Sequence, residues 1–363
     1  MAKDPRRIAL VLGGGGMKGF AHIGVMKALE ERGVVPTLYA GTSIGALLAA
    51  ARVGGMSVDE QARRAESLKR RDLFRINHFG MLMERMRSPS IYLEEPLREL
   101  CEAVVPAGKF TDLETTLHVN TVDIERGTQV VWGTPGLRDV HVHDAVYASC
   151  ALPGYFPPGR VDSRICIDGG VIDNLPAGVA ALSADLVIAV DVGSGDLRPV
   201  TGVSGHGFAN IYMRAATTMM HSLQQFPLEH WKGPPMILIR PRLGQDWLSF
   251  SNIPSNIREG YRAALKALEE YDAICEQPGG VWPRRRFEIE VDRDKCISCG
   301  LCVALAPTLM GLEPGAEGKA YVRTRSVDWS PADGEFVHHC PTGAILARKV
   351  ERVAPPKLDR GAA

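Results

Sequence analysis

Gly41-Thr42-Ser43-Ile44-Gly45 stands between a short apolar run at residues 38–40 and a run of small residues at 46–51. A strand, a sharp turn and a helix in this order form the context in which a G-x-S-x-G pentapeptide becomes a nucleophile elbow. Glycines suit both sides of such a turn, because its backbone is strained and the strand and helix pass close together. A glycine- and serine-rich turn without chemistry is the alternative interpretation. The stretch therefore predicts an α/β unit and makes Ser43 a candidate nucleophile.

Glycines also follow the first apolar run of the chain, in the pattern Gly14-x-Gly16-x-x-Gly19. This pattern fits the dinucleotide-binding fingerprint, but that site needs an acidic residue about 20 positions later, at the end of the second strand. At that strand end the chain has Ser43 instead. A P-loop is excluded because Phe20, and not lysine, follows the last glycine. The remaining interpretation is an oxyanion hole, since glycines at a helix start leave backbone N–H groups that can donate to a developing negative charge.

A third motif, Asp168-Gly169-Gly170, ends a short strand that the sequence predicts at residues 165–167. The aspartate could serve as an ordinary turn residue. In a doubly wound sheet, however, ligands and catalytic groups collect at the ends of strands. We therefore expect Asp168 and Ser43 to lie near each other.

The charge balance argues against two classes of partner. The 363 residues include 42 basic and 42 acidic ones, for a formal net charge of +0. This balance gives no support to nucleic-acid binding or to bulk attraction to anionic membranes. No apolar run approaches the roughly 20 residues that span a bilayer. The apolar run at residues 8–12, which follows a basic N-terminus, is too short for a signal peptide. We expect a cytoplasmic protein.

Residues 73–83 form an unusually apolar segment that is rich in methionine. Core packing is one interpretation of this segment. The other is a mobile flap or a lipid-facing entrance, because methionine suits adaptable apolar surfaces. On the second interpretation the protein makes transient contact with a membrane surface and is peripheral to it.

The rest of the chain alternates predicted strands and helices, which indicates an α/β fold. The run at 186–191 is continuously apolar, as in a parallel strand that is buried on both faces. A proline- and glycine-rich segment at 278–283 marks a domain boundary. The predicted strands lie at residues 8–12, 38–40, 117–124, 128–132, 165–167, 186–191 and 236–240, and the longer predicted helices at 56–68, 90–105 and 257–274.

The eight cysteines fall into a scattered group (Cys101, Cys150, Cys166 and Cys275) and a C-terminal group (Cys296, Cys299, Cys302 and Cys340). A large chain without a secretory signal needs no disulfides, so the C-terminal group indicates a metal site and the scattered ones buried thiols. C-x-x-C-x-x-C followed by a distant Cys-Pro matches bacterial-type ferredoxin ligation, whereas a zinc ribbon presents two separated C-x-x-C pairs. Because no second triplet exists, we expect Cys340 to close the same cluster. Cys299 in the middle position favours a 4Fe–4S cube over a three-iron form.

Residues 6–276 resemble the bacterial branch of the patatin-like phospholipase family. The resemblance rests on the glycine run at 13–19, the G-T-S-I-G pentapeptide, the stretch A-S-C-A-L-P-G-Y-F-P-P at 148–158 and the D-G-G motif, which follow the family's order. It implies a three-layer α/β/α sandwich and lipid acyl hydrolysis by a Ser–Asp dyad without histidine. Ser43 would be the nucleophile and Asp168 the general base. The oxyanion donors would be Gly14, Gly15, Gly16 and the Met17 amide, and the other motif residues are Gly19, Gly41, Gly45, Gly169 and Gly170.

A conventional triad with histidine is the alternative to this dyad. An α/β-hydrolase places its histidine after the acid in the chain. Five histidines precede Asp168 and do not fit that order, namely His22, His78, His118, His141 and His143. His221 and His230 follow it, but they lie on a predicted helix and just beyond its end, with no loop signature.

Residues 287–347 resemble single-cluster bacterial ferredoxins, and we expect the domain to span residues 287–349. The resemblance implies a small α+β domain that holds one 4Fe–4S cluster on the four C-terminal cysteines. Residues 277–286 would form the linker, and residues 350–363 a disordered tail. Electron transfer to an unknown redox partner is our first interpretation of the cluster, and redox gating of the hydrolase or a structural role are the alternatives.

The sequence therefore predicts a serine-dependent hydrolase of lipid esters, a phospholipase or esterase, fused to a one-electron carrier. The alternative function is an electron-transfer protein whose patatin-like domain serves as a binding or docking module. A nicotinamide-dependent oxidoreductase would explain the fusion, but the chain lacks the ribose-binding acid.

Overall fold

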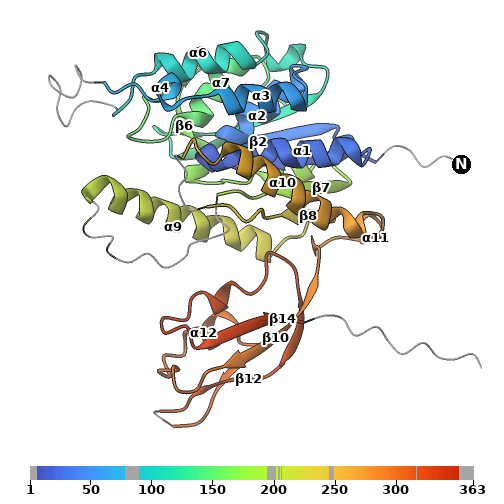
Figure 1. The fold of residues 1–363 in the computed structure, drawn as a ribbon, viewed down its shortest axis with the longest axis vertical. Coiled ribbons are helices and arrows are strands. Elements are labelled where there is room, and N and C mark those ends of the chain that lie inside the picture. The colour runs from blue at the N-terminus through green and yellow to red at the C-terminus, as the bar shows by residue number, and fades with distance from the viewer. Residues whose placement is uncertain are drawn as a thin grey trace, which may run out of the picture. The chain divides into compact units, whose positions relative to one another are not determined.

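A computed structural model describes residues 6–77, 90–193, 202, 205, 207–244, 249–315 and 317–350. The chain divides into two compact units, Met1–Trp282 and Pro283–Ala363 (Figure 1). Each unit has a hydrophobic core of its own. Most of the methionine-rich segment, from residue 78 on, and the tail from residue 351 on lie outside the described residues.

Within the described residues, the first unit is built on a nine-stranded sheet of order β5-β6-β3-β2-β1-β7-β8-β9, with β4 paired to β3. Six neighbouring strands of this sheet run parallel to one another, in the order β3-β2-β1-β7-β8-β9. The pairs that involve β4, β5 and β6 are antiparallel. The strands are β1 (Ile8–Leu12), β2 (Leu38–Thr42), β3 (Thr116–Asp123), β4 (Thr128–Trp132), β5 (Gly159–Val161), β6 (Arg164–Asp168), β7 (Leu186–Val190), β8 (Met236–Ile239) and β9 (Val281–Trp282).

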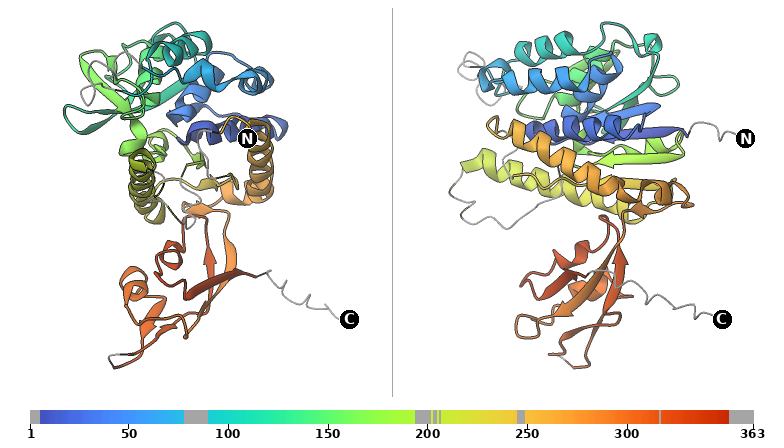
Figure 2. Two further views of the ribbon diagram at one scale, coloured as in Figure 1. Left: turned by 60° about the vertical axis from the view of Figure 1, so that its left-hand side comes forward. Right: turned by 45° about the vertical axis from the view of Figure 1, so that its right-hand side comes forward.

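Helices cover both faces of this sheet, and α9 and α10 lie on opposite sides of it (Figure 2). The α-helices are α1 (Ala21–Glu31), α2 (Ile44–Val53), α3 (Val58–Ser67), α4 (Arg70–Leu73), α6 (Glu95–Val104), α7 (Val142–Cys150), α8 (Ala177–Ala181), α9 (Gly207–Glu229), α10 (Ile253–Ala267) and α11 (Tyr271–Cys275). Short 3₁₀ turns are η1 (Gly16–Phe20), η3 (Phe110–Asp112), η4 (Gly169–Val171) and η6 (Leu268–Glu270). This architecture confirms the predicted α/β class with a central, mostly parallel sheet.

The central strands end level with one another. Every residue of β1, β2 and β7 is buried, as expected for parallel strands covered on both faces. Leu12 is in register with Gly41 on one side and with Val190 on the other. The segments that leave these strands therefore start at the same edge of the sheet, which is where ligands bind in open α/β folds.

Asp168 reaches this edge from the opposite direction. β6 runs antiparallel to β3, with Asp168 opposite Thr121, while Thr42 at the end of β2 is opposite Asn120. Only β3 therefore separates the last residue of β6 from the end of β2. The sequence predicts Asp168 at a strand end, but it does not predict that this strand is antiparallel.

Two helices differ from their predicted extents. The helix predicted at 90–105 begins only at Glu95, because Ser90 forms an isolated bridge to Gly154. The helix predicted at 257–274 is broken into α10, η6 and α11, and α10 begins at Ile253, where a proline occupies the first turn as helix starts allow. Among the described helices, none combines the length and the apolar character that a membrane crossing needs.

The second unit is a small sheet domain, as predicted. Its three-stranded antiparallel sheet has the order β13-β10-β14. The strands β11 and β12, which lie between β10 and β13 in the sequence, form a separate two-stranded sheet. Its core includes Ile289, Met310, Trp329 and Phe336. The elements are β10 (Arg285–Val291), α12 (Leu301–Leu305), β11 (Met310–Leu312), β12 (Ala320–Val322), β13 (Ser326–Trp329), η7 (Glu335–Val337) and β14 (Ile345–Lys349).

Candidate functional site

Ser43 forms the strained turn between β2 and α2. Its φ is 56° and its ψ −128°, a backbone conformation that residues other than glycine rarely adopt. Close contacts explain the two flanking glycines: a Cβ on Gly41 would lie 2.5 Å from the Ala46 nitrogen, and one on Gly45 would lie 2.0 Å from the Leu12 carbonyl oxygen. Strain of this kind persists only where the surroundings hold it, and it collects at functional sites.

Ser149 at the end of α7 holds this turn in place. The backbone N–H of Ser43 donates to the Ser149 Oγ at 2.8 Å, and the Ser149 hydroxyl donates to the carbonyl oxygen of Asn120 at 2.7 Å. Ser149 belongs to the 148–158 stretch, for which the sequence predicts no role in the site. The family resemblance of this stretch was the one sequence signal that could have indicated a role for Ser149. Only the fold shows that Ser149 supports the Ser43 turn.

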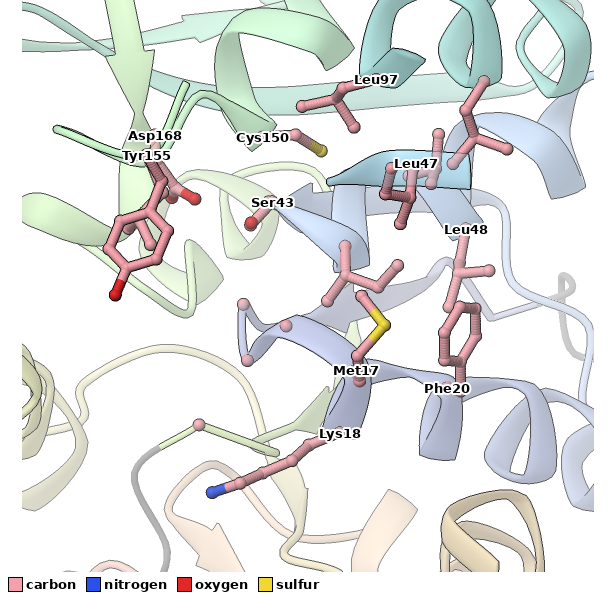
Figure 3. A pocket seen from close by; sticks show the side chains of 18 of the residues that line it. Met17, Lys18, Phe20, Ser43, Leu47, Leu48, Leu97, Cys150, Tyr155 and Asp168 are labelled. Carbon is pink, nitrogen blue, oxygen red and sulfur yellow. The ribbon is translucent and has the colours of Figure 1, made fainter. Parts of the chain in front are cut away.

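Asp168 lies beside Ser43 with its carboxylate turned toward the serine (Figure 3). Its Oδ1 accepts the Gly170 N–H at 2.8 Å, and Ser43 lies close enough for its hydroxyl to lower the pKa of this carboxyl group. Burial raises the pKa of Asp168 to about 6, and the Gly170 N–H and the neighbouring Ser43 hydroxyl offset only part of that effect. A carboxyl group with this pKa is ionised at neutral pH and still basic enough to take up a proton.

The glycine-rich segment lies next to Ser43, since a Cβ on Gly14 would be 3.3 Å from the Ser43 Cβ. The Gly14 N–H donates to the Asn174 carbonyl oxygen at 3.1 Å, so in this structure it is not available to an oxyanion, unlike the predicted donors that follow it. Among the described residues, no acceptor is found for the N–H groups of Gly15 and Gly16. These two N–H groups, with the predicted Met17 amide beside them in η1, remain the candidate oxyanion donors.

The remaining motif glycines allow close packing around the site. A Cβ on Gly19 would lie 2.1 Å from the Ile44 Cγ2, so this glycine lets η1 approach the start of α2. A Cβ on Gly169 would lie 2.4 Å from the Asn120 carbonyl oxygen. These glycines bring three segments of the chain together around Ser43, and none of them needs to contact a ligand.

Ser43 and Asp168 open into a cavity of about 380 Å³, a size typical of small-ligand sites. On one side of Ser43 its wall is apolar (Figure 3). That wall comes mainly from η1, α2, α3 and α6, with Phe20, Leu47, Leu48, Ala51, Ala65, Leu97, Leu100 and Val104. Lys18 and the α9 residues Arg214, Thr217, His221 and Gln224 line other parts of the cavity. The arrangement suits a ligand with a long apolar part and a polar part.

A cysteine also lines the cavity beside the serine. Hydrogen bonding to Cys101, together with burial, raises the pKa of Cys150 well above its usual value. Cys150 therefore stays a neutral thiol at physiological pH, and a neutral thiol is a poor nucleophile. Ser43 remains the candidate nucleophile.

The histidines do not form a triad with Asp168 in the described residues. His221 lines the cavity from α9, and His230 is exposed, with its ring Nδ1 bonded to the Phe226 carbonyl oxygen. His22 and His118 are buried, and burial lowers the pKa of each to about 4. His78 lies outside the described residues.

In the second unit the four clustered cysteines surround one small cavity. Backbone N–H groups point at two of the sulfurs, from Ala320 to Cys296 at 3.4 Å and from Ala344 to Cys340 at 3.2 Å. Among the described residues, no three His, Cys, Asp or Glu side chains converge closely enough to hold a single metal ion. Four thiols around a common space, with N–H donors to the sulfurs, fit a cluster in which each thiolate binds its own iron.

Family models match both units. The model described as patatin-like phospholipase matches residues 10–181, and the model described as 4Fe-4S single cluster domain matches residues 289–346. The chain contains a patatin-like phospholipase domain followed by a 4Fe–4S single cluster domain. The first match includes Ser43 and Asp168, and the second includes all four cysteines of the cluster motif.

Relatives of the patatin-like domain occur in bacteria and animals. An uncharacterised NTE family protein of Mycobacterium tuberculosis is 35% identical over 194 residues, which are 53% of this chain and 51% of that protein. Human patatin-like phospholipase domain-containing protein 6 is 36% identical over 201 residues, 52% of this chain and 14% of that protein. The crystal structure of VipD from Legionella pneumophila covers 73% of this chain and 67% of its own, at 18% identity and a TM-score of 0.39. In sequence, the chain thus matches about half the length of the bacterial relative and a smaller share of the human one.

Proposed function

We propose that the patatin-like domain is a serine hydrolase that cleaves the acyl ester bond of lipids, with Ser43 as nucleophile and Asp168 as the only general base. The observation that carries this proposal is a buried carboxylate turned toward the Ser43 side chain, in a cavity with bare backbone N–H groups beside it (Figure 3). A serine hydroxyl is a weak nucleophile until a base takes its proton, and Asp168 is placed to do so.

In the acylation step Asp168 takes the proton from the Ser43 Oγ while that oxygen attacks the acyl carbonyl carbon. The carbonyl oxygen becomes an oxyanion, which the N–H groups of Gly15, Gly16 and Met17 stabilise. Collapse of this intermediate breaks the ester C–O bond, and the alcohol leaves with the proton from Asp168. Water then repeats the sequence: Asp168 takes its proton, the oxygen attacks the acyl carbon, and the fatty acid leaves as Ser43 regains a proton.

The shape of the cavity supports a lipid substrate. The apolar wall formed by α2, α3 and α6 would take the acyl chain, with the ester carbon at Ser43. One curated relative is named lysophospholipase NTE1, from Mycosarcoma maydis, at 36% identity over 200 residues, 52% of this chain and 10% of that protein. We infer that this domain acts on the same broad class of lipid esters.

We further infer that Cys296, Cys299, Cys302 and Cys340 hold one 4Fe–4S cluster. A bound cluster of this type supplies one-electron transfer. The N–H groups of Ala320 and Ala344 would donate to ligand sulfurs, which tunes the potential of such clusters. A separate redox protein would then exchange electrons with this unit.

Ser43→Ala is the direct test of the hydrolase proposal. We expect it to lower kcat/KM for a short-chain aryl ester by on the order of 10⁴-fold or more, because no acyl-enzyme can form. His221→Ala should retain most of the activity, since His221 is not the base. Wild-type rates in Ser43→Ala would refute the serine mechanism, and loss of activity in His221→Ala would favour the triad over the dyad.

The cavity also predicts a dependence on acyl-chain length. Val104 lines the cavity from the last turn of α6. A tryptophan there should shorten the space for the acyl chain. We expect kcat/KM for long-chain esters to fall by about tenfold or more, because a few methylene groups would lose their contact with the cavity wall. Rates with acetyl or butyryl esters should change little. Leu182→Trp, at a position that is 84% exposed and does not line the cavity, is the control. An equal loss for all chain lengths would argue against this acyl path.

A further inference from the structure

Three buried side chains donate hydrogen bonds to carbonyl oxygens of the glycine-rich segment. The His22 Nε2 lies 2.8 Å from the Gly13 oxygen, the Asn174 Nδ2 lies 3.1 Å from the Gly14 oxygen, and the Asn256 Nδ2 lies 3.2 Å from the Met17 oxygen. They come from α1, from the loop between η4 and α8, and from α10. Each is at most 6% exposed. The mechanism derived above uses none of them.

Asn174 has the most direct effect on an oxyanion donor. A trans peptide group points its C=O and N–H in opposite directions, so fixing the Gly14 oxygen also fixes the direction of the Gly15 N–H. The Asn174 side chain holds that oxygen, and its own backbone carbonyl accepts the Gly14 N–H at 3.1 Å. Asn174 therefore grips Gly14 on both sides and sets the peptide that carries the Gly15 donor.

His22 acts on the preceding peptide group. A carbonyl oxygen can only accept, so the His22 Nε2 carries the proton and donates it to Gly13. The ring Nδ1 is buried and has no hydrogen-bond partner among the described residues, and burial lowers the pKa of His22 to about 4, so the ring is neutral. The Gly14 N–H, opposite the held Gly13 oxygen, is directed to Asn174. The two contacts are thus consecutive along the backbone.

We propose that Asn174, His22 and Asn256 are positioning residues that hold the oxyanion hole in its working geometry before substrate binds, with Asn174 aiming the Gly15 N–H. This proposal rests on the proposed hydrolase function. Donors aligned beforehand need no reorganisation as charge develops, which is the main source of their effect on rate. Asn174 also lies shortly after Asp168, in the loop between η4 and α8, so one short segment carries the proposed base and sets the donor.

Asn174→Asp is the first test, because it keeps the shape of the side chain and replaces the N–H donor by an acceptor facing the Gly14 oxygen. We expect kcat for a short-chain aryl ester to fall by about 10²-fold with KM changed less than threefold, as for loss of an oxyanion donor. Affinity for an acyl trifluoromethyl ketone, whose adduct with Ser43 places an oxyanion in the hole, should fall by a similar factor. Binding of a fatty alcohol, which forms no adduct, should stay unchanged.

Variants of His22 provide a second test, which can still be carried out if Asn174→Asp does not fold. His22→Leu should lower kcat and weaken the ketone adduct, and His22→Gln, whose amide N–H can reach the Gly13 oxygen, should restore most of both. Trp132→Phe, in β4, is the control for a loss of stability alone. It deletes one buried hydrogen bond, which the indole N–H donates to the Thr121 hydroxyl.

Two results would overturn the proposal. One is wild-type kcat in folded Asn174→Asp and His22→Leu. The other is a loss of kcat with unchanged affinity for the ketone, which would place the effect elsewhere than the oxyanion hole. Failure of the hydrolase proposal itself has a different signature, because Ser43→Ala would then keep its activity and the ketone would form no adduct at Ser43.

Discussion

Asp168→Asn should lower kcat by about 10²–10⁴-fold and at the same time make the protein more stable at pH 7. The loss of activity follows from the loss of the base, because an amide cannot take the Ser43 proton. In the wild type the same carboxyl must be ionised to act, so kcat/KM should fall as the pH drops below about 6, the pKa of the buried group. Ester hydrolysis between pH 4 and 9 measures both effects.

The gain in stability follows from the direction of the pKa shift. The carboxyl pKa is about 6 in the folded protein, whereas an aspartate in an unfolded chain has its ordinary pKa of 3.8. The folded state therefore holds the proton more tightly, and stability that is present below about pH 4 is lost as the pH rises to about 6. Above pH 6 the buried carboxylate costs roughly 3 kcal/mol, since each unit of pKa corresponds to about 1.4 kcal/mol. Asparagine avoids this cost and can still accept the Gly170 hydrogen bond.

The measurement is the unfolding temperature of both proteins at pH 4 and pH 8. The variant should be more stable at pH 8, and the difference should shrink toward pH 4. Asp185→Asn is the matched control, because hydrogen bonds from Arg7 lower the pKa of Asp185 to about 2, so its removal should not stabilise the protein. An Asp168→Asn variant that is inactive but less stable at pH 8 would contradict the assignment of a buried, costly charge.

Cys299→Ser should remove the cluster and unfold much of the second unit. Cys299 is exposed, so the substitution changes no core packing and acts through lost ligation. The core of this unit is small, and domains of this size commonly depend on a bound metal for their stability. We expect about four iron and four sulfide per chain in the wild type prepared without oxygen, and a clear loss of both in the variant.

Cys275→Ser is the control for the loss of a cysteine, because Cys275 is a buried thiol of the first unit. Iron content and limited proteolysis of the full chain should distinguish the two variants, with new cleavage between residues 285 and 349 only in Cys299→Ser. Ester hydrolysis should persist in both if the cluster does not act on Ser43. A Cys299→Ser protein with full iron content, or a wild type without iron, would contradict the proposed ligand set.

Local sequence patterns determined the parts of this protein whose physics is local. Glycines on both sides of Ser43 predict the strained turn because few other residues tolerate the contacts with Leu12 and Ala46. The apolar runs of β1, β2 and β7 predict buried parallel strands. Cysteine spacing likewise indicates the second unit, because ligands three residues apart can surround one cluster whatever the rest of the chain does.

Tertiary structure alone decided which groups meet and which donors are available. Asp168 reaches Ser43 on an antiparallel strand, and no local pattern reports the direction in which a strand enters a sheet. Gly14 looked like its neighbours in the sequence, yet the Asn174 carbonyl occupies its N–H. Three of the side chains that support the site lie 29 to 239 positions along the chain from the residues they bind, namely Ser149, Asn174 and Asn256. The fourth, His22, lies in the helix that follows the glycine-rich segment. Hydrogen bonds over such separations depend on the packing of the whole sheet and its helices. The sequence therefore indicates the candidate nucleophile, and only the fold shows what holds it in place.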